Sequence, residues 1–327
     1  MDTALRPMST SQVLDRTFSL YRQNFWLFAG IALIAPALRL IAALAQLAVF
    51  GPLVAPDPGK FDPQMFQQFF VKALIAMAVG SIVYLIGTAF ASSATIYAVS
   101  MVHLNKATTI AESYAKVRPI FWRILGLIIR VFFLAFWPFL AGYALITLAA
   151  IGTAGLVRNG GASAAVMGIF VGLAALTTIV GGFIWAIIAL CRYALAVPAC
   201  TLEKLPAKVS VIRSKFLTQG CKGSILLIYI LTGLLTVALT YVLQLPGLLA
   251  SNVMWFSTRV HMSTASLIWV YIAEFLGGAI AGPIATIAIA LMYYDQRVRK
   301  EAFDLQLMMQ AITPDVAAQA STASGMA

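Results

Sequence analysis

Charged side chains are scarce in this sequence. Asp, Glu, Lys and Arg make up only 10% of the 327 residues, whereas hydrophobic residues make up 61%. A soluble domain carries about 25% charged residues, and its core does not absorb several apolar runs of about 20 residues or more. The composition therefore excludes an ordinary soluble protein and predicts a membrane protein.

Histidine and cysteine are also rare. The chain has two histidines, His103 and His261, and three cysteines, Cys191, Cys200 and Cys221. The cysteines lack the spacing of a metal site, and their odd number does not indicate a disulfide framework. The sequence contains no G-x-S-x-G or H-E-x-x-H motif and no nucleotide-binding loop. We therefore expect a protein that is not an enzyme and needs no metal or cofactor.

Long apolar runs dominate what is present. A helix needs about 20 apolar residues to cross a bilayer. Prolines inside the runs, above all Pro36, Pro138 and Pro283, are predicted kink sites, as are pairs of adjacent glycines. We predict an all-α polytopic fold with one membrane domain over 1–312, followed by a disordered tail over 313–327. The six predicted transmembrane helices cover residues 25–50, 71–101, 120–151, 164–200, 223–250 and 266–294.

The net charge of +11 is unevenly distributed along the chain. Sixteen of the 22 Lys and Arg residues fall on one side of the predicted spans and four fall on the other. Because cytoplasmic loops of membrane proteins are rich in Lys and Arg, this asymmetry predicts that both termini are cytoplasmic. It also accounts for the positive charge without a nucleic-acid partner.

Short amphipathic segments precede three of the spans on the predicted inner side. They cover residues 9–24, 109–118 and 206–218. Their apolar stripes have helical spacing and consist of Leu14, Phe18, Tyr21 and Phe25, then Ile110, Tyr114 and Val117, then Val209, Ile212 and Phe216. Ser9 with Gln12 and Thr109 with Glu112 are spaced as capping boxes, and Pro206 suits a first helical turn. We expect helices that lie on the inner membrane surface.

The three segments align with one another at offsets of 96 and 102 residues. One interpretation is a threefold repeat, in which each unit holds an interfacial helix, a span and a returning span. The alternative is that any basic amphipathic helix before a span has this appearance.

Three stretches of the chain carry a family resemblance. They are residues 5–9 (LRPMS), 14–18 (LDRTF) and 20–25 (LYRQNF); residues 192–198 (RYALAVP) with Glu203; and residues 293–305 (YYDQRVRKEAFDL). The chain resembles bacterial proteins of the glycerophosphoryl diester phosphodiesterase membrane domain family. The resemblance implies a helical domain in a bacterial plasma membrane. It implies no catalytic residue, because in fused members the phosphodiester chemistry belongs to an attached soluble barrel.

Ionisable residues inside the predicted spans are functional candidates, because burying charge in a bilayer is costly. They are Arg39, Arg130 and Glu274. At 1.5 Å per residue, Arg39 lies about 21 Å from the inner edge of its span, at a depth that Glu274 can share, and Arg130 lies about 15 Å from the edge of its own. We predict that Glu274 pairs with Arg39, and Arg130 is the alternative partner. The pair either fixes helix register or lines a polar path.

A second candidate site is the dense basic region between the fourth and fifth spans. Its members are Lys204, Lys208, Arg213, Lys215 and Lys222. Such residues attract anionic lipid head groups by about 1 kcal/mol each. The alternative is that their charge only sets the topology.

Three functions follow from these candidates. The first is a non-enzymatic membrane protein that binds or handles anionic phospholipid or supports envelope organisation. The second is a transporter or channel for a small solute that uses Arg39, Arg130 and Glu274. The third is an assembly partner of another membrane protein.

Overall fold

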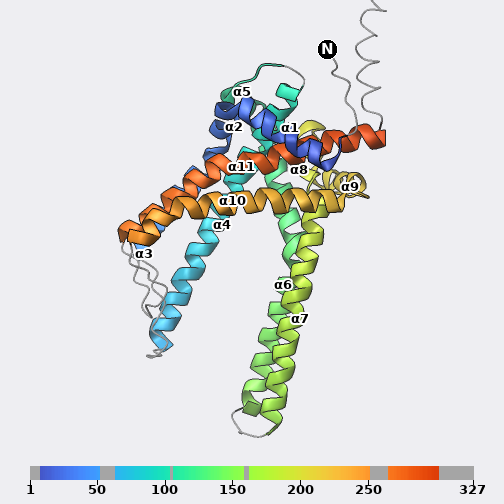
Figure 1. Cartoon of the computed structure of the whole chain (residues 1–327). Helices are drawn as coiled ribbons and strands as arrows, with labels where there is room; N and C mark the ends of the chain where they lie inside the picture. Colours follow the sequence, from blue (N-terminus) through green and yellow to red (C-terminus); the bar gives the residue numbers. More distant parts are fainter. Residues whose placement is uncertain (1–7, 52–62, 104–105, 158–161, 251–263, 302–327) are drawn as a thin grey trace, which may run out of the picture.

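The computed structural model describes residues 8–51, 63–103, 106–157, 162–250 and 264–301. All regular structure in these residues is helical (Figure 1). Six helical segments are long and apolar enough to span a membrane, which confirms the predicted all-α polytopic class. They are Phe25–Phe50, Val71–His103, Ile110–Phe139, Ile169–Leu202, Lys222–Leu249 and Thr264–Glu301. The tail predicted over 313–327 lies outside the described residues.

The elements follow the same order three times along the chain. Helix α1 (Thr10–Gln23) precedes α2 (Phe25–Ala32), α3 (Ile34–Phe50) and α4 (Pro63–His103). Helix α5 (Ile110–Val117) and the 3-10 turn η1 (Arg118–Ile120) precede α6 (Phe121–Val157) and α7 (Ala162–Tyr193). Helix α8 (Ala196–Leu202) leads to α9 (Ala207–Leu217), which precedes α10 (Lys222–Ala250) and α11 (Thr264–Glu301). Each unit thus consists of a short helix and a helical hairpin, the order that the predicted repeat requires.

The short helices begin where the sequence signals place them. The Ser9 side chain accepts a hydrogen bond from the Gln12 amide, and the Gln12 side chain accepts one from the Ser9 amide, so this capping box is complete. Thr109 accepts a hydrogen bond from the Glu112 amide at the start of α5. Pro206 has extended backbone angles and precedes α9 as its N-cap, one position before the first turn that we predicted for it.

Two predicted spans are broken by proline. The first divides at Leu33 into α2 and α3, because Pro36 has no N–H to donate to the Ala32 carbonyl and its ring crowds that carbonyl. The fourth, predicted as a span over 164–200, ends as α7 at Tyr193 and resumes as α8. Pro198 stands in the same relation to Ala194, and the two helices still form one candidate span, Ile169–Leu202.

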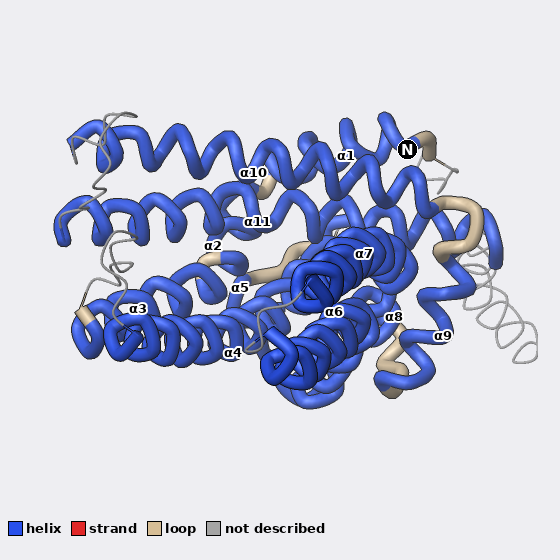
Figure 2. Tube along the Cα trace, turned by 90° about the horizontal axis from the view of Figure 1, so that it is seen from below, coloured by secondary structure: helices blue, strands red, loops and turns tan. Residues whose placement is uncertain are grey.

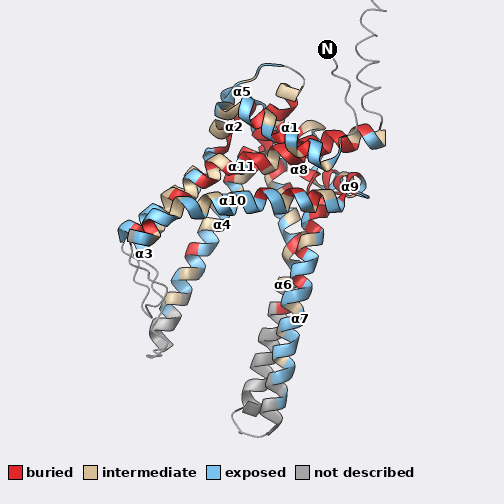
Figure 3. Cartoon of the chain, in the orientation of Figure 1, coloured by how far each residue is buried: buried red, intermediate tan, exposed pale blue. Residues whose placement is uncertain are grey.

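Packing is centred on α11, which contacts α1, α2, α3, α4, α8, α9 and α10. In its most apolar window 61% of the residues are buried, against 17–28% in the other five spans. Figure 3 shows the buried residues gathered where α1, α2, α8 and α11 meet. Tyr293 is fully buried there. The exposed apolar surface of the other long helices is what lipid would cover.

The hairpins diverge from one end of the molecule, which holds α1, α5, α8 and α9 (Figure 1). We call it the basic end, because most of the Lys and Arg side chains lie there. The α3–α4 and α10–α11 hairpins pack together through α3 and α11. The α6–α7 hairpin projects by itself, and Figure 2 looks along it. This arrangement places the inner faces of α3, α4, α10 and α11 around a common space.

Candidate functional site

A cavity of about 460 Å³ lies between α3, α4, α10 and α11. Proteins bind small ligands in spaces of this size, roughly 300–1,000 Å³. All four helices belong to apolar spans, yet the cavity wall is rich in polar side chains. Its lining consists of Ala32, Ala35, Pro36, Arg39, Tyr84, Thr88, Ala91, Ser92, Thr95, Thr236, Thr240, Glu274, Gly278, Gly282, Pro283 and Thr286.

An ion pair stands at this cavity. The Nε and Nη2 atoms of Arg39 each lie 3.1 Å from Oε2 of Glu274. The Arg39 guanidinium also lies 5.7 Å from the centre of the Tyr84 ring, a separation at which a cation is attracted to an aromatic face. The pair joins α3 to α11, as the first of the two predicted pairings requires, and that pairing is confirmed.

The pair lies deep in its spans and is only partly covered by protein. Arg39 is 14 residues from Phe25, which is about 21 Å along a helix, and Glu274 is ten residues from Thr264, about 15 Å. The exposed fraction is 49% for the Arg39 side chain and 35% for the Glu274 side chain. Charged surface uncovered at such depth is costly in contact with lipid chains. The pair is therefore a candidate for contact with water or a polar ligand.

Four of the seven hydroxyl-bearing side chains of the lining present hydrogen-bond acceptors to the cavity. Thr88, Ser92, Thr95 and Thr236 each donate their hydroxyl hydrogen to the carbonyl four residues earlier in the same helix. A hydroxyl has one hydrogen and two lone pairs. Once the hydrogen is used, the oxygen is left to accept from a ligand or from water.

Small residues bring the cavity walls together. A Cβ atom on Gly278 would lie 3.2 Å from Cβ of Pro36, and a Cβ atom on Gly87 would lie 2.9 Å from Cα of Ala35. Larger residues at these glycines would push α3 away from α11 and α4. Gly282 differs, because a Cβ atom there meets no heavy atom within 4 Å and opens into the cavity.

Arg130 lies away from this cavity. It is exposed on α6, in the separate α6–α7 hairpin, and within the described residues it makes no ion pair with Glu274. Arg130, the alternative partner in the prediction, is therefore not the residue that pairs with Glu274. The reason is that depth in a span fixes the position of a residue along the membrane normal and leaves its neighbouring helix undetermined.

The five predicted head-group residues differ in their surroundings. Lys208 and Lys222 are exposed. The Lys215 ammonium lies 5.8 Å from the centre of the Tyr193 ring. Lys204 has a left-handed backbone, with φ of 53°, and faces a second cavity of about 330 Å³ together with Lys116. The basic end thus offers separate cationic surfaces instead of one continuous patch.

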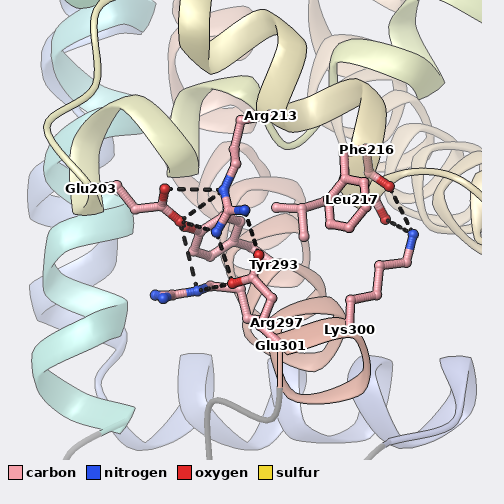
Figure 4. A network of polar contacts seen from close by, with 8 residues as sticks. All are labelled: Glu203, Arg213, Phe216, Leu217, Tyr293, Arg297, Lys300 and Glu301. Atoms are coloured by element: carbon pink, nitrogen blue, oxygen red, sulfur yellow. Dashed lines mark hydrogen bonds and ion pairs between the residues drawn. The ribbon is translucent and has the colours of Figure 1, made fainter. Parts of the chain in front are cut away.

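Arg213 is held by acidic partners. Its Nη2 atom donates to Oε1 of Glu203 at 3.0 Å and to Oε2 of Glu301 at 2.7 Å. Figure 4 shows these side chains converging with Arg297 and with the Tyr293 hydroxyl, which donates to Glu203. Burial alone lowers the pKa of Arg213, but hydrogen bonds to the two carboxylates outweigh burial and raise it. Arg213 is therefore a permanent charge neutralised within the protein.

The same region of α11 fixes two further segments. The Lys300 ammonium donates to the carbonyls of Phe216, Leu217 and Gln219, at the C-terminus of α9. Asp295 accepts from the Met8 amide and from Arg299, whose guanidinium also donates to the Met8 carbonyl. The predicted pairs of Asp295 with Arg299 and of Arg297 with Glu301 are both present. These contacts make the end of α11 the anchor of the basic end.

Sequence reasoning missed Tyr84 and the hydroxyl residues of the cavity. A signal for those on α4 was present, because Tyr84, Thr88, Ser92 and Thr95 are spaced 4, 4 and 3 residues apart and so share one helical face. A polar stripe within an apolar span marks a face turned away from lipid. On α10, Thr232, Thr236 and Thr240 repeat every four residues and give a similar stripe, of which Thr236 and Thr240 line the cavity.

The comparisons with known proteins identify no family for this chain. No family model, no curated protein and no solved structure matches the chain. The fold defines an all-α, multi-pass membrane protein. The resemblance to the glycerophosphoryl diester phosphodiesterase membrane domain stays a prediction.

Proposed function

We propose that this protein binds a polar ligand inside the membrane, in the cavity between α3, α4, α10 and α11, and that it carries a small solute without catalysing a reaction. The observation that supports this most is the Arg39–Glu274 pair, which borders the cavity with 49% and 35% of its side chains uncovered. Ionisable groups in spans that are not covered by protein face water or a substrate path in membrane proteins.

The position of the cavity suits a carrier. It lies between the α3–α4 hairpin and the α10–α11 hairpin, which contact each other through α3 and α11. Binding sites between helical units near mid-membrane are reached alternately from the two sides when one unit moves against the other. The small residues Ala35, Gly87 and Gly278 let these helices approach closely without interlocking side chains, so one hairpin can move against the other.

We also propose that the basic end faces the cytoplasm of a bacterial cell, with both termini on that side. The bias of Lys and Arg toward this end supports the orientation. Exposed Trp26 and Trp122 support it as well, because tryptophan is enriched where helices meet the membrane surface.

The first experiment measures whether the cavity is wet. Thr88→Cys places a thiol in the lining, and Ile86→Cys places one at nearly the same depth but about 200° around α4, facing away. We expect a water-soluble, positively charged thiosulfonate to label Thr88→Cys at least about tenfold faster, because only ionised thiols in water react. The native cysteines are buried, so the wild-type protein sets the baseline. Equal, slow labelling of both variants contradicts a polar cavity.

A second candidate function, the binding of anionic phospholipid, is favoured by the cavity at the basic end. Lys116 and Lys204 line its 330 Å³ together with the hydroxyl residues Tyr97, Ser100 and Thr201. The two lysines can donate charge-assisted hydrogen bonds to a phosphate group, whereas the Ser100 and Thr201 hydroxyls donate to carbonyls of their own helices. Beside it, α9 exposes Val209, Ile212 and Phe216 and buries the opposite face, as a helix in the membrane surface does.

This candidate is tested by lipid retention. We expect Lys116→Gln with Lys204→Gln to reduce the phosphatidylglycerol that co-purifies in mild detergent, measured by native mass spectrometry, by about thirtyfold, since each lysine contributes about 1 kcal/mol. The control removes the same charge at exposed Lys106 and Arg118, which do not line the cavity. Equal loss from both double variants indicates a general effect of charge and rejects a built site.

A further inference from the structure

We infer that the ligand of the intramembrane cavity is a zwitterion, with an ammonium group that carries N–H donors and an anionic carboxylate or phosphate group. The inference rests on the proposed function and specifies the ligand class of the same site. It is argued from the charge balance of the cavity, from the free atoms of the ion pair and from the state of the hydroxyls.

The charge of the lining is balanced. Arg39 is its cation and Glu274 is its carboxylate, and the other lining residues are apolar or carry hydroxyls. A ligand with net charge would bring an uncompensated charge into an apolar span, which is strongly unfavourable. A ligand with equal positive and negative charges keeps the site neutral. The balance therefore favours ligands without net charge.

The ion pair leaves one charged atom on each partner unused. Both contacts from Arg39 converge on Oε2 of Glu274. In the described part of the chain, Nη1 of Arg39 and Oε1 of Glu274 make no hydrogen bond. The first is a donor suited to an anion and the second an acceptor suited to a cation. Because charge-assisted hydrogen bonds are about twice as strong as neutral ones, a zwitterion gains more here than a neutral polyol.

Four lining hydroxyls favour one kind of cation. Thr88, Ser92, Thr95 and Thr236 have used their hydrogens within their own helices, so their oxygens accept. A primary ammonium offers three N–H donors and no acceptor, which complements these oxygens and Oε1 of Glu274. A quaternary ammonium has no N–H to offer. The site therefore distinguishes two cations of equal charge.

Such a ligand has two sources, a free amino acid or the ethanolamine head group of a lipid. The first arm of the test uses soluble three-carbon probes of similar size: β-alanine, propionate, propylammonium and glycerol, titrated calorimetrically into the purified protein in detergent. We expect β-alanine to bind at least about tenfold more tightly than the other three. Arg39→Gln and Glu274→Gln each remove this preference, and Gly233→Leu, on the exposed face of α10, retains it.

The second arm uses nanodiscs that contain equal amounts of phosphatidylethanolamine, phosphatidylcholine and phosphatidylglycerol, with retained lipid identified by native mass spectrometry. Ethanolamine and choline head groups have the same net charge and differ in their N–H donors. We expect at least threefold enrichment of the ethanolamine lipid over both others, lost in Glu274→Gln and kept in Gly233→Leu.

The outcomes are distinct. Preference for the zwitterion in the first arm alone identifies a free solute, and in the second arm alone it identifies a lipid; either supports the inference. Equal binding of glycerol, propionate and β-alanine overturns it, as does the absence of any preference in both arms. Fast labelling of Thr88→Cys in the same preparation then shows that the polar cavity survives, so failure of the ligand class is separated from failure of the proposed function.

Discussion

Arg39 and Glu274 neutralise each other between α3 and α11, and the consequence is measurable. Glu274→Gln leaves Arg39 unpaired in an apolar span. A fully buried pair loses about 3–5 kcal/mol when one partner is removed; because this pair is partly exposed, we expect about 1–2 kcal/mol. The double change Arg39→Gln with Glu274→Gln removes both charges and should cost less than the sum of the single changes. Unfolding by denaturant in mixed micelles gives the free energies, and strictly additive losses contradict the coupling.

The sequence was sufficient to pair these two residues and insufficient to find their surroundings. Charged residues in apolar runs are rare, so depth alone brought Arg39 and Glu274 together. Threonine and serine are common in membrane helices and donate to their own backbone, so the polar stripe of Thr88 and Ser92 on α4 did not identify a cavity until the fold placed it together with Thr236. Arg130 shows the limit of depth, because its helix packs elsewhere.

Helix α9 is held against α11 by the group of Glu203, Arg213 and Glu301. Arg213→Gln removes one of the two cations that Glu203 and Glu301 share, and Arg297 remains beside both. We therefore expect a loss of about 1–2 kcal/mol of unfolding free energy, reduced from the fully buried case by partial exposure and by Arg297. The matched control Lys208→Gln, exposed on the same helix, should change stability by less than about 0.5 kcal/mol. Hydrogen exchange should show faster exchange of the α9 amides in Arg213→Gln alone. Equal exchange in both variants contradicts an anchoring role.

Sequence patterns predicted the helices better than their partners. The starts of α1 and α5 followed from Ser9 and Thr109, since a cap acts over three residues and is read locally. The stripe on α9 was identified, and its exposure agrees with the predicted helix in the membrane surface, but the protein contacts of the opposite face were not predicted. Val209, Ile212 and Phe216 turn outward, and small residues such as Ser210 and Ser214 pack inward, where the Ser214 hydroxyl donates to the Arg192 carbonyl.

The whole molecule consists of hairpins that diverge from the basic end around α11. Apolar periodicity does not predict this divergence, because a helix face that contacts lipid is as apolar as one that contacts protein. Helix association depends instead on the close packing of small residues. Gly87, Gly277 and Gly278 mark the close contacts only once their opposite residues Ala35, Thr240 and Pro36 are known. The cavity lies beside these contacts, and hydroxyl groups and the ion pair line it.

Filling this cavity tests the account most directly. Gly282→Leu extends a side chain into the cavity without meeting a neighbouring atom at Cβ, whereas Gly233→Leu extends one from the outer face of α10. In the Thr88→Cys background, we predict that Gly282→Leu slows thiosulfonate labelling several-fold with the unfolding transition preserved, and that Gly233→Leu leaves labelling unchanged. Labelling of Thr88→Cys that is equally fast with Gly282→Leu in a folded protein contradicts a ligand cavity between α3, α4, α10 and α11.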